Sequence, residues 1–368
     1  MRTLSLAAML AALAFGVARA DDTKTMTSSQ MNAPVPGMPM LPGAHGPDGM
    51  MGDQMLDEGE IAFAYGFGHM DMSGLMDGDS HVTPAEVLAM PNPFAGRPGQ
   101  PANYRVVPDS MTAERHVIGA AYGVTDWLTL RVRGSHVRKT MEMRVFEPMG
   151  TTLTGIASGT SSGVGDTEVA GITRLFDDGA THLHATLGAS LPTGSITEEG
   201  TMLTPMGGVM TMRRPYGMQL GSGTVDLLPG ISLTERAGRF AYGARVEGVL
   251  RLGRNDEGYS LGDGAVASLW GSAMLLPGLM AQASVTGSTL GAIDGQDDAI
   301  FGPMPTADPA NYGGERIELG VGFGYMPMMG PLAGHGVMVE ARLPVYQNLN
   351  GPQLGQNFAV MAGYRVRF

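Results

Sequence analysis

Apolar and polar side chains alternate along residues 357–368, at the end of the chain. The apolar positions are Phe358, Val360, Ala362, Tyr364, Val366 and Phe368, and the opposite face carries Asn357, Met361, Arg365 and Arg367. Because successive side chains of a β-strand point to opposite faces, this period of two predicts a strand with one apolar face. A single strand of a soluble sandwich would alternate in the same way, so the distinction depends on the whole chain.

The same alternation recurs often enough to predict about twelve strands. The clearest further segments are residues 60–67, 128–133, 182–190, 239–252, 316–325 and 337–343, and weaker ones are residues 112–122, 166–176, 223–234, 264–274 and 279–290. A tilted strand needs roughly ten residues to cross a bilayer, and most of these segments approach that length.

The connections between these segments alternate between long and short. The long ones are residues 70–111, 138–165, 192–222, 253–263 and 291–314, and the short ones are "GVTD", "DDGA", "ERAG", "LLPG" and "MPMMGPLAGH", with "QNLNGPQLGQ" before the last strand. Outer-membrane barrels have long outer loops, short periplasmic turns and an even number of strands, whereas a sandwich has no such preference. The pattern therefore predicts an all-β, antiparallel transmembrane β-barrel of about 12 strands over residues 59–368.

Charged residues occupy the polar faces in mid-strand, where a water-filled or salt-bridged lumen would accommodate them. The candidate lumen residues are Arg131, Arg133, His182, His184, Arg245, Glu247, Glu318, Glu340 and Arg342. Two interpretations stay open at this stage. The charges form either a mutually neutralising network that fills a small barrel or a selective constriction for an anion or polar solute.

The start of the chain predicts export. Residues 1–20, "MRTLSLAAMLAALAFGVARA", combine Arg2, an apolar run and small residues before Asp21, which is the pattern of a cleaved signal peptide. Residues 21–58 are rich in Met, Pro and Gly, so we expect a disordered periplasmic leader rather than a folded domain. A TonB-type plug would need a longer leader than this.

Composition narrows the function classes. Cleavage would leave 21 basic against 35 acidic residues, and such an acidic chain is a poor candidate for nucleic-acid binding. Cysteine is absent, which excludes disulfides and thiolate metal sites. The segment "GTSSG" matches a hydrolase motif but is expected in a Gly/Ser loop without the strand–turn–helix setting of a nucleophile, so we do not expect an enzyme.

Several motifs are distinctive, among them "YGVTDWLTL", "LPTGSI", "RPYGMQLGSGTVDLLPG" and "TADPANYGGERIELGVG". They resemble motifs of a bacterial outer-membrane protein family described as transporters and grouped with the outer-membrane protein of the meta-cleavage phenol-degradation pathway. The resemblance implies an outer-membrane barrel with no catalytic residues. It also implies that Phe368, as a terminal aromatic residue, is presented to the barrel-insertion machinery.

Methionine is concentrated near the N-terminus, with ten of the 30 methionines between Met26 and Met76. Thioether sulfur is a soft ligand that selects Cu(I), and a Met-rich leader before a barrel resembles outer-membrane proteins of copper-resistance systems. The candidate ligands are Met38, Met40, His45, Met50, Met51, Met55, His69, Met70, Met72 and Met76. The alternative is that these methionines are apolar fillers of loops.

The sequence as a whole predicts a barrel in the bacterial outer membrane, in contact with lipid and lipopolysaccharide, that passes a small solute passively. A link to copper handling is a further hypothesis. A second hypothesis is a Cu(I)-binding protein for which the barrel is an anchor, and a third is a structural barrel with a filled lumen. The sequence indicates no cofactor other than the Cu(I) of the copper hypothesis.

Overall fold

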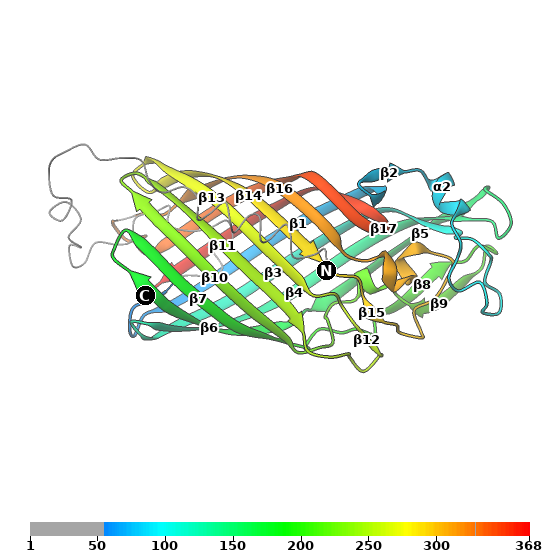
Figure 1. Ribbon diagram of the computed structural model, residues 1–368, viewed down its shortest axis with the longest axis horizontal. Helices are drawn as coiled ribbons and strands as arrows, with labels where there is room; N and C mark the ends of the chain where they lie inside the picture. The colour runs from blue at the N-terminus through cyan, green and yellow to red at the C-terminus, as the bar shows by residue number, and fades with distance from the viewer. Residues whose placement is uncertain (1–54, 328) are drawn as a thin grey trace.

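The computed structural model describes residues 55–327 and 329–368, and one closed antiparallel sheet dominates it (Figure 1). The strands of the ring are, in order of pairing, β1 (Ile61–Gly78), β3 (Val106–Thr125), β4 (Leu128–Phe146), β6 (Thr167–Asp177), β7 (Thr181–Leu191), β10 (Asp226–Ala237), β11 (Phe240–Arg251), β13 (Gly264–Leu276), β14 (Leu279–Leu290), β16 (Gly314–Tyr325) and β17 (His335–Arg367). Pairing of β17 with β1 closes the ring. The predicted all-β antiparallel barrel is confirmed.

Strand β17 is 33 residues long and occupies two places in the ring. Its first part, up to Leu349, pairs with β16, and the part from Leu349 onward pairs with β1. Between the two parts, Gly351 adopts a φ of 71°. At the other end of β17, the backbone N–H of Arg367 donates to the carbonyl of Gly334 at 3.1 Å. The chain therefore turns back on itself within β17. Counting its two parts separately gives agreement with the expectation of about twelve strands.

The exterior of the ring is apolar, as the alternation predicts. On β1 the side chains of Ile61, Phe63 and Tyr65 are exposed while the intervening positions face inward, and Val337 and Val339 of β17 behave in the same way. Exposed aromatic residues stand next to the short turns, among them Tyr122, Trp127, Phe176, Phe240, Tyr242, Tyr325, Tyr364 and Phe368. Such a girdle is typical of the boundary between the apolar band and water in membrane barrels.

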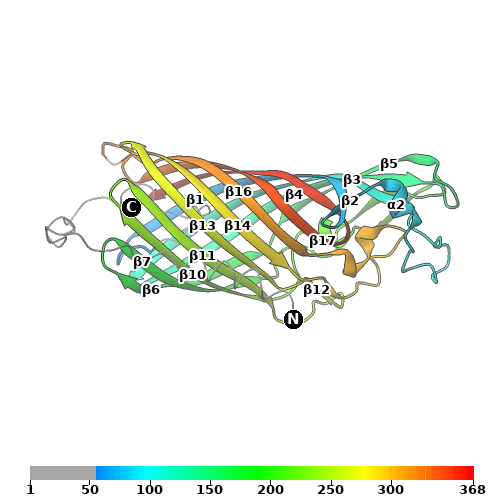
Figure 2. The ribbon, with the colours of Figure 1, turned by 45° about the horizontal axis from the view of Figure 1, so that its top comes forward.

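The two ends of the barrel differ (Figures 1 and 2). The tight turns and the C-terminus lie at one end, and the long connections and their short elements lie at the other. We call these the short-turn end and the long-loop end. The elements of the long connections are β2 (Ser80–Val82), α2 (Pro84–Ala89), β5 (Leu153–Val164), β8 (Glu199–Leu203), β9 (Val209–Arg213), η3 (Tyr216–Met218), β12 (Tyr259–Ser260), β15 (Asp294–Gly295), η4 (Pro305–Ala307) and η5 (Pro309–Asn311).

Three strands are longer than the sequence indicated. Residues 70–78, 106–111 and 138–146 were expected in loops, but they belong to β1, β3 and β4. The physical reason is that the period of two continues beyond the apolar exterior. Met111, Met141 and Met143 still face inward, while His136 and Arg144 of β4 face outward and are exposed. The strands leave the apolar band without losing their pairing.

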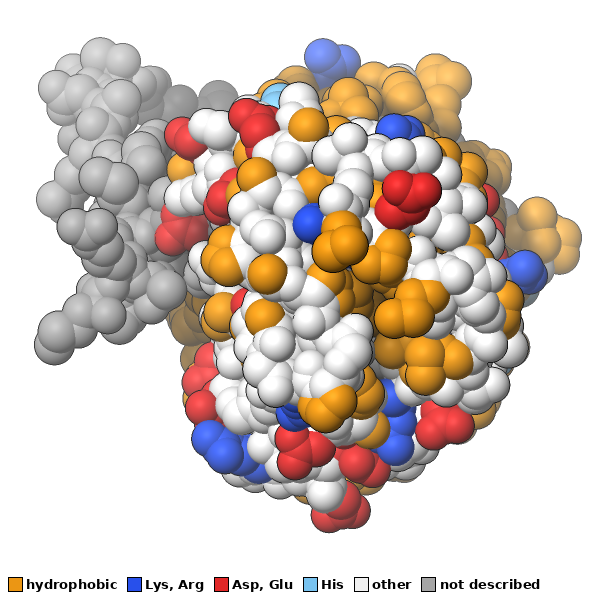
Figure 3. Space-filling view, turned by 90° about the vertical axis from the view of Figure 1, so that its right-hand side faces the viewer, with side chains coloured by type: hydrophobic (Ala, Val, Ile, Leu, Met, Phe, Trp, Pro, Cys, Tyr) orange, Lys and Arg blue, Asp and Glu red, His pale blue; other side chains and the backbone are white. Residues whose placement is uncertain are grey.

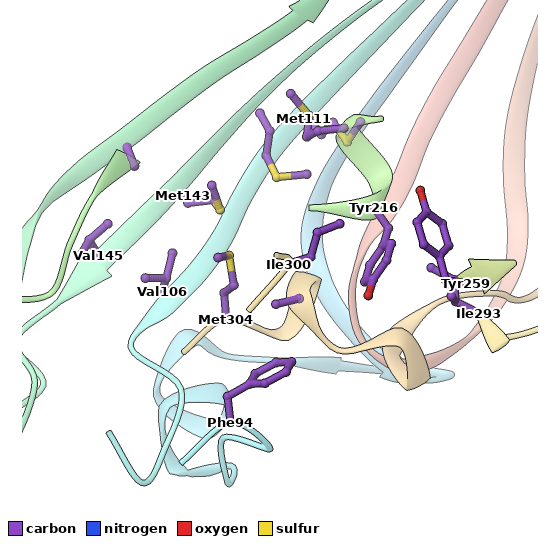
Figure 4. Packing of buried hydrophobic residues seen from close by; sticks show 14 residues of the cluster. Phe94, Val106, Met111, Met143, Val145, Tyr216, Tyr259, Ile293, Ile300 and Met304 are labelled. Atoms are coloured by element: carbon purple, nitrogen blue, oxygen red, sulfur yellow. The ribbon is translucent and has the colours of Figure 1, made fainter. Parts of the chain in front are cut away.

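A buried apolar cluster lies at the long-loop end and draws residues from strands and loops (Figure 4). Its members are Phe94, Val106, Met111, Met141, Met143, Val145, Ala157, Tyr216, Met218, Tyr259, Ile293, Ile300, Met304 and Ala307. In the close view Met143 of β4 and Met304, just before η4, point toward each other. We call this set the loop-end cluster. It holds the long connections against the inner wall of the barrel.

None of the helices among the described residues has the length and apolar character needed to cross a membrane.

Candidate functional site

A cavity of about 310 Å³ lies in the lumen between opposite walls of the barrel. Residues of β1, β3, β4, β11 and β17 line it, namely Gly66, Phe67, Gly68, Arg115, Val117, Arg133, Arg245, Glu247, Met338, Glu340, Met361, Ala362 and Gly363. We call it the central cavity. Four of the candidate lumen residues, Arg133, Arg245, Glu247 and Glu340, meet here.

One wall of the central cavity carries two arginines that share a carboxylate. Arg115 of β3 contacts one oxygen of Glu168 with Nη2 at 3.2 Å, and Arg133 of β4 contacts the other oxygen with Nε at 3.1 Å and with Nη2. The side chain of Glu168 is only 14% exposed, whereas that of Arg115 is 51% exposed. Neighbouring Arg131 is buried as well. The wall therefore has more positive than negative charge.

The opposite wall holds acids that are engaged with other groups. Glu340 is 1% exposed and accepts hydrogen bonds from Arg342 Nε at 2.9 Å, Ser284 Oγ at 3.1 Å and Gln282 Nε2 at 3.3 Å. Glu247 forms an ion pair with Arg245 on the same face of β11. Room for Glu340 comes from the inward-facing glycines of β16, whose Cβ positions it would otherwise overlap.

A second cavity, of about 460 Å³, extends toward the long-loop end and also contacts Glu247. Its lining includes Arg316, Tyr312 and Gln353. Glu318 is close by, where it accepts a hydrogen bond from Gln356 Nε2 at 2.6 Å. Because Glu247 borders both spaces, they follow one another along the lumen.

The remaining candidate lumen residues lie nearer the short-turn end. His182 Nδ1 is 3.0 Å from Asp177 Oδ2, and in the register of the sheet His184 stands opposite Arg174 of β6 and Ser232 of β10. The candidates are therefore distributed along the barrel, and four of them line the central cavity.

Residues just before β1 also reach the short-turn end. Leu56 is 2% exposed, and its backbone N–H donates to Thr129 Oγ1 of β4 at 2.9 Å. Leu56 therefore contacts the inner wall of the barrel before β1 begins.

The long loops meet over the lumen through a group of tyrosines. Tyr216 stacks edge-on against Tyr259, with ring centroids 4.8 Å apart, and against Tyr312 at 5.6 Å. The hydroxyl of Tyr312 donates to the Thr306 carbonyl at 2.6 Å and accepts from the Gly217 N–H at 3.2 Å. Burial raises the pKa of Tyr216 to about 12 and also raises the pKa of Tyr259 and of Tyr312.

An ion cluster joins three of these loops. Arg213 of β9 contacts Asp297 at 2.9 Å and Glu257 at 3.4 Å, and the side chains of Arg213 and Asp297 are 13% and 2% exposed. Figure 3 shows the long-loop end, where hydrophobic side chains gather near the middle and most charged side chains lie farther out. We call the three loops that Arg213 joins, residues 192–222, 253–263 and 291–314, the loop cap.

Several candidate metal ligands do not lie in the loops expected from the sequence. Met38, Met40, His45, Met50 and Met51 lie outside the described residues. Met70, Met72 and Met76 belong to β1 instead of a loop, Met72 packs against the loop-end cluster, and Met76 is 6% exposed. His69 faces outward and lies 3.7 Å from Glu114. Within the described part of the chain, no three His, Cys, Asp or Glu side chains are grouped to hold a metal.

The lumen residues expected from the sequence do not include Arg115, which lines the central cavity, or its ion partner Glu168. Arg115 and Glu168 lie in segments where apolar and polar residues alternate only weakly, so the inward face was not evident from the sequence. A usable signal was the even numbering of the outward residues Ile118, Ala120 and Tyr122, which places the odd-numbered Arg115 on the inner face of β3.

Comparison with known proteins supports the fold. No family model matches the chain, and no curated protein does. Among solved structures, an outer membrane channel from Pseudomonas putida F1 has a TM-score of 0.54 at 14% identity, covering 86% of this chain and 97% of that chain. The P. putida toluene transporter TodX gives a TM-score of 0.43 at 12% identity over 85% and 91% of the two chains. A Pseudomonas aeruginosa FadL homologue gives 0.41 at 9% identity over 84% and 90%. The first likeness shows a shared barrel fold.

Proposed function

We propose that the protein is a passive channel of the bacterial outer membrane that lets a small solute cross through its lumen. The observation that carries this proposal is the central cavity, which is lined by charged side chains inside a closed ring with an apolar exterior. Lipid tails solvate the exposed apolar faces. Pairing of β17 with β1 closes the described ring without a free edge, so the ring suits a bilayer. A polar solute that does not enter the lipid can then cross the membrane through the polar lumen.

The orientation of the barrel follows from its two ends. Outer-membrane barrels keep short turns in the periplasm and long loops outside, which places the loop cap at the cell surface. On the exterior, the row formed by His69, Glu114 and Arg138 across β1, β3 and β4 is polar and stands on the long-loop side of the apolar residues. Such a row suits the headgroups of lipopolysaccharide, which is the lipid partner we assign to this end.

Conductance tests the proposal directly. The full chain, folded and inserted into planar bilayers, is expected to give discrete single-channel currents that neutralisation of Arg133 changes. The matched control is Arg144→Gln, because Arg144 lies on the same strand but faces outward and is exposed. A folded, inserted protein that stays silent at all voltages would favour the barrel with a filled lumen and would contradict the channel.

A further inference from the structure

The charge balance of the central cavity is uneven. The single carboxylate of Glu168 contacts two guanidinium groups, those of Arg115 and Arg133. The three side chains together therefore carry one net positive charge. The side chain of Arg115 is half exposed and lines the cavity, which leaves its N–H donors accessible to a ligand. The excess is local, since the whole chain carries a formal net charge of −12.

The acids across the cavity do not offset this excess. The Glu340 carboxylate is held by Arg342, Ser284 and Gln282 and is almost fully buried. Glu247 forms an ion pair with Arg245, which itself lines the cavity. A cation entering this space would face arginines from both walls and would find each lining acid already paired.

The rest of the lining is apolar. Val117 of β3, Met338 and Met361 of β17 and the backbone of Gly66 and Gly363 border the same space. Ligand pockets range from about 300 to 1,000 Å³, so a cavity of about 310 Å³ admits only a compact molecule. Methionine side chains adapt to a small apolar body of variable shape.

We propose that the central cavity binds a small organic monoanion, a carboxylate with a compact apolar body. The carboxylate contacts Arg115, which presents the planar fork of donors that suits a carboxylate, and the apolar body contacts Val117, Met338 and Met361. This inference rests on the proposed channel and names the class of solute that the channel selects.

The mixed lining also distinguishes this class from an inorganic anion. The oxygens of phosphate all accept hydrogen bonds from water. Any oxygen directed at Met338 or Met361 would lose that water without gaining a hydrogen-bond donor. An uncharged aromatic alcohol of similar size would keep the apolar contacts but forgo the charge-assisted hydrogen bond.

Equilibrium binding to the full chain folded in neutral detergent tests the site without requiring conduction. Isothermal titration with benzoate is compared with benzyl alcohol, benzylamine and inorganic phosphate. We expect benzoate to bind most tightly and added salt to weaken it. A hydrogen bond to a charged group contributes enough that Arg115→Gln should weaken benzoate binding about tenfold or more. Arg138→Gln, which removes an outward-facing arginine from the neighbouring strand, should leave it unchanged.

Arg115→Lys provides a second variant in case the glutamine variant folds poorly. It keeps the charge but loses the planar fork, so its affinity should fall between those of the unaltered chain and Arg115→Gln. Equal binding of benzoate and benzyl alcohol, equal effects of the Arg115 and Arg138 variants, or phosphate binding as tight as benzoate would overturn the inference. Benzoate binding to a silent barrel would contradict only the channel, and conductance without benzoate binding would contradict only this site.

Discussion

At the scale of single residues, the inner face of β16 depends on the lack of a side chain at Gly320. A Cβ added there would overlap Ser284 Oγ and Glu340 Oε1, both of which belong to the hydrogen-bonded group around Glu340. Gly320→Ala is therefore expected to destabilise the barrel by about 1–3 kcal/mol, the usual cost of overpacking. Urea unfolding followed by gel mobility of the folded form measures the loss.

Gly271→Ala is the control for that substitution. Gly271 lies on the outer face of β13, where an added Cβ meets no atom within 4 Å. Its alanine variant should unfold at the same urea concentration as the unaltered chain or at a slightly higher one, because alanine restricts the unfolded backbone. Equal losses in both variants would mean that glycine serves general backbone flexibility and not the packing of Glu340.

Glu340 itself gives a second prediction. Replacing it with glutamine leaves Arg342, whose side chain is 11% exposed, beside a neutral group, and breaking a buried ion pair costs about 3–5 kcal/mol. Glu114→Gln removes a carboxylate from an exposed contact with His69, where the loss should be at most about 1 kcal/mol. Thermal unfolding compares the two variants. A Glu340 variant as stable as the Glu114 variant would show that the buried pair contributes little.

At the scale of elements, the loop cap should respond to alkaline pH. The pKa of Tyr216 is raised to about 12 by burial, against roughly 10 in an unfolded chain. A raised pKa means that the packed loops favour the neutral phenol, so this stabilisation is complete below about pH 10 and is lost as the pH rises toward 12. Absorbance of tyrosinate, combined with limited proteolysis of the loops, should show delayed ionisation and then cleavage in that interval.

Tyr312→Phe separates the cap from the barrel in this experiment. The variant loses the hydrogen bonds to Thr306 and Gly217, so proteolysis of the loops should begin at lower pH while the barrel remains folded. Ionisation of all tyrosines together near pH 10, with intact loops beyond pH 12, would contradict a cap held by buried phenols.

The sequence predicts the ring better than the cap, and the reason is the range of the interactions. Strand faces follow from neighbours two residues apart, so the exterior of β11 and of β16 could be assigned from alternation alone. The cap depends on contacts such as the backbone N–H groups of Arg105 and Val106, which both donate to the Pro303 carbonyl from a distant part of the chain. No local pattern encodes such a contact, and for this reason the sequence places Met72 and Met76 in a loop and not in β1.

At the scale of the whole molecule, the loop cap and the charged lumen stand in series. In the proposed channel, a solute from the long-loop end would meet the tyrosines and the ion cluster of Arg213 before it reached the central cavity. In a series arrangement the narrower element limits the current, while the charged element sets which ions carry it. The two parts should therefore be separable by mutation.

Arg213→Ala tests this separation. The change leaves Asp297, which is 2% exposed, without its ion partner, and such a loss costs about 3–5 kcal/mol, enough to loosen the loops that Arg213 joins. Single-channel conductance should rise, whereas anion selectivity measured from the reversal potential should stay unchanged because Arg115 and Arg133 are untouched. The control is Arg254→Ala, which removes an exposed pair with Asp294 in the same group of loops and should alter neither quantity. A rise in conductance accompanied by loss of selectivity would place the selective element in the cap, and an unchanged conductance with loosened loops would mean that the lumen limits the current.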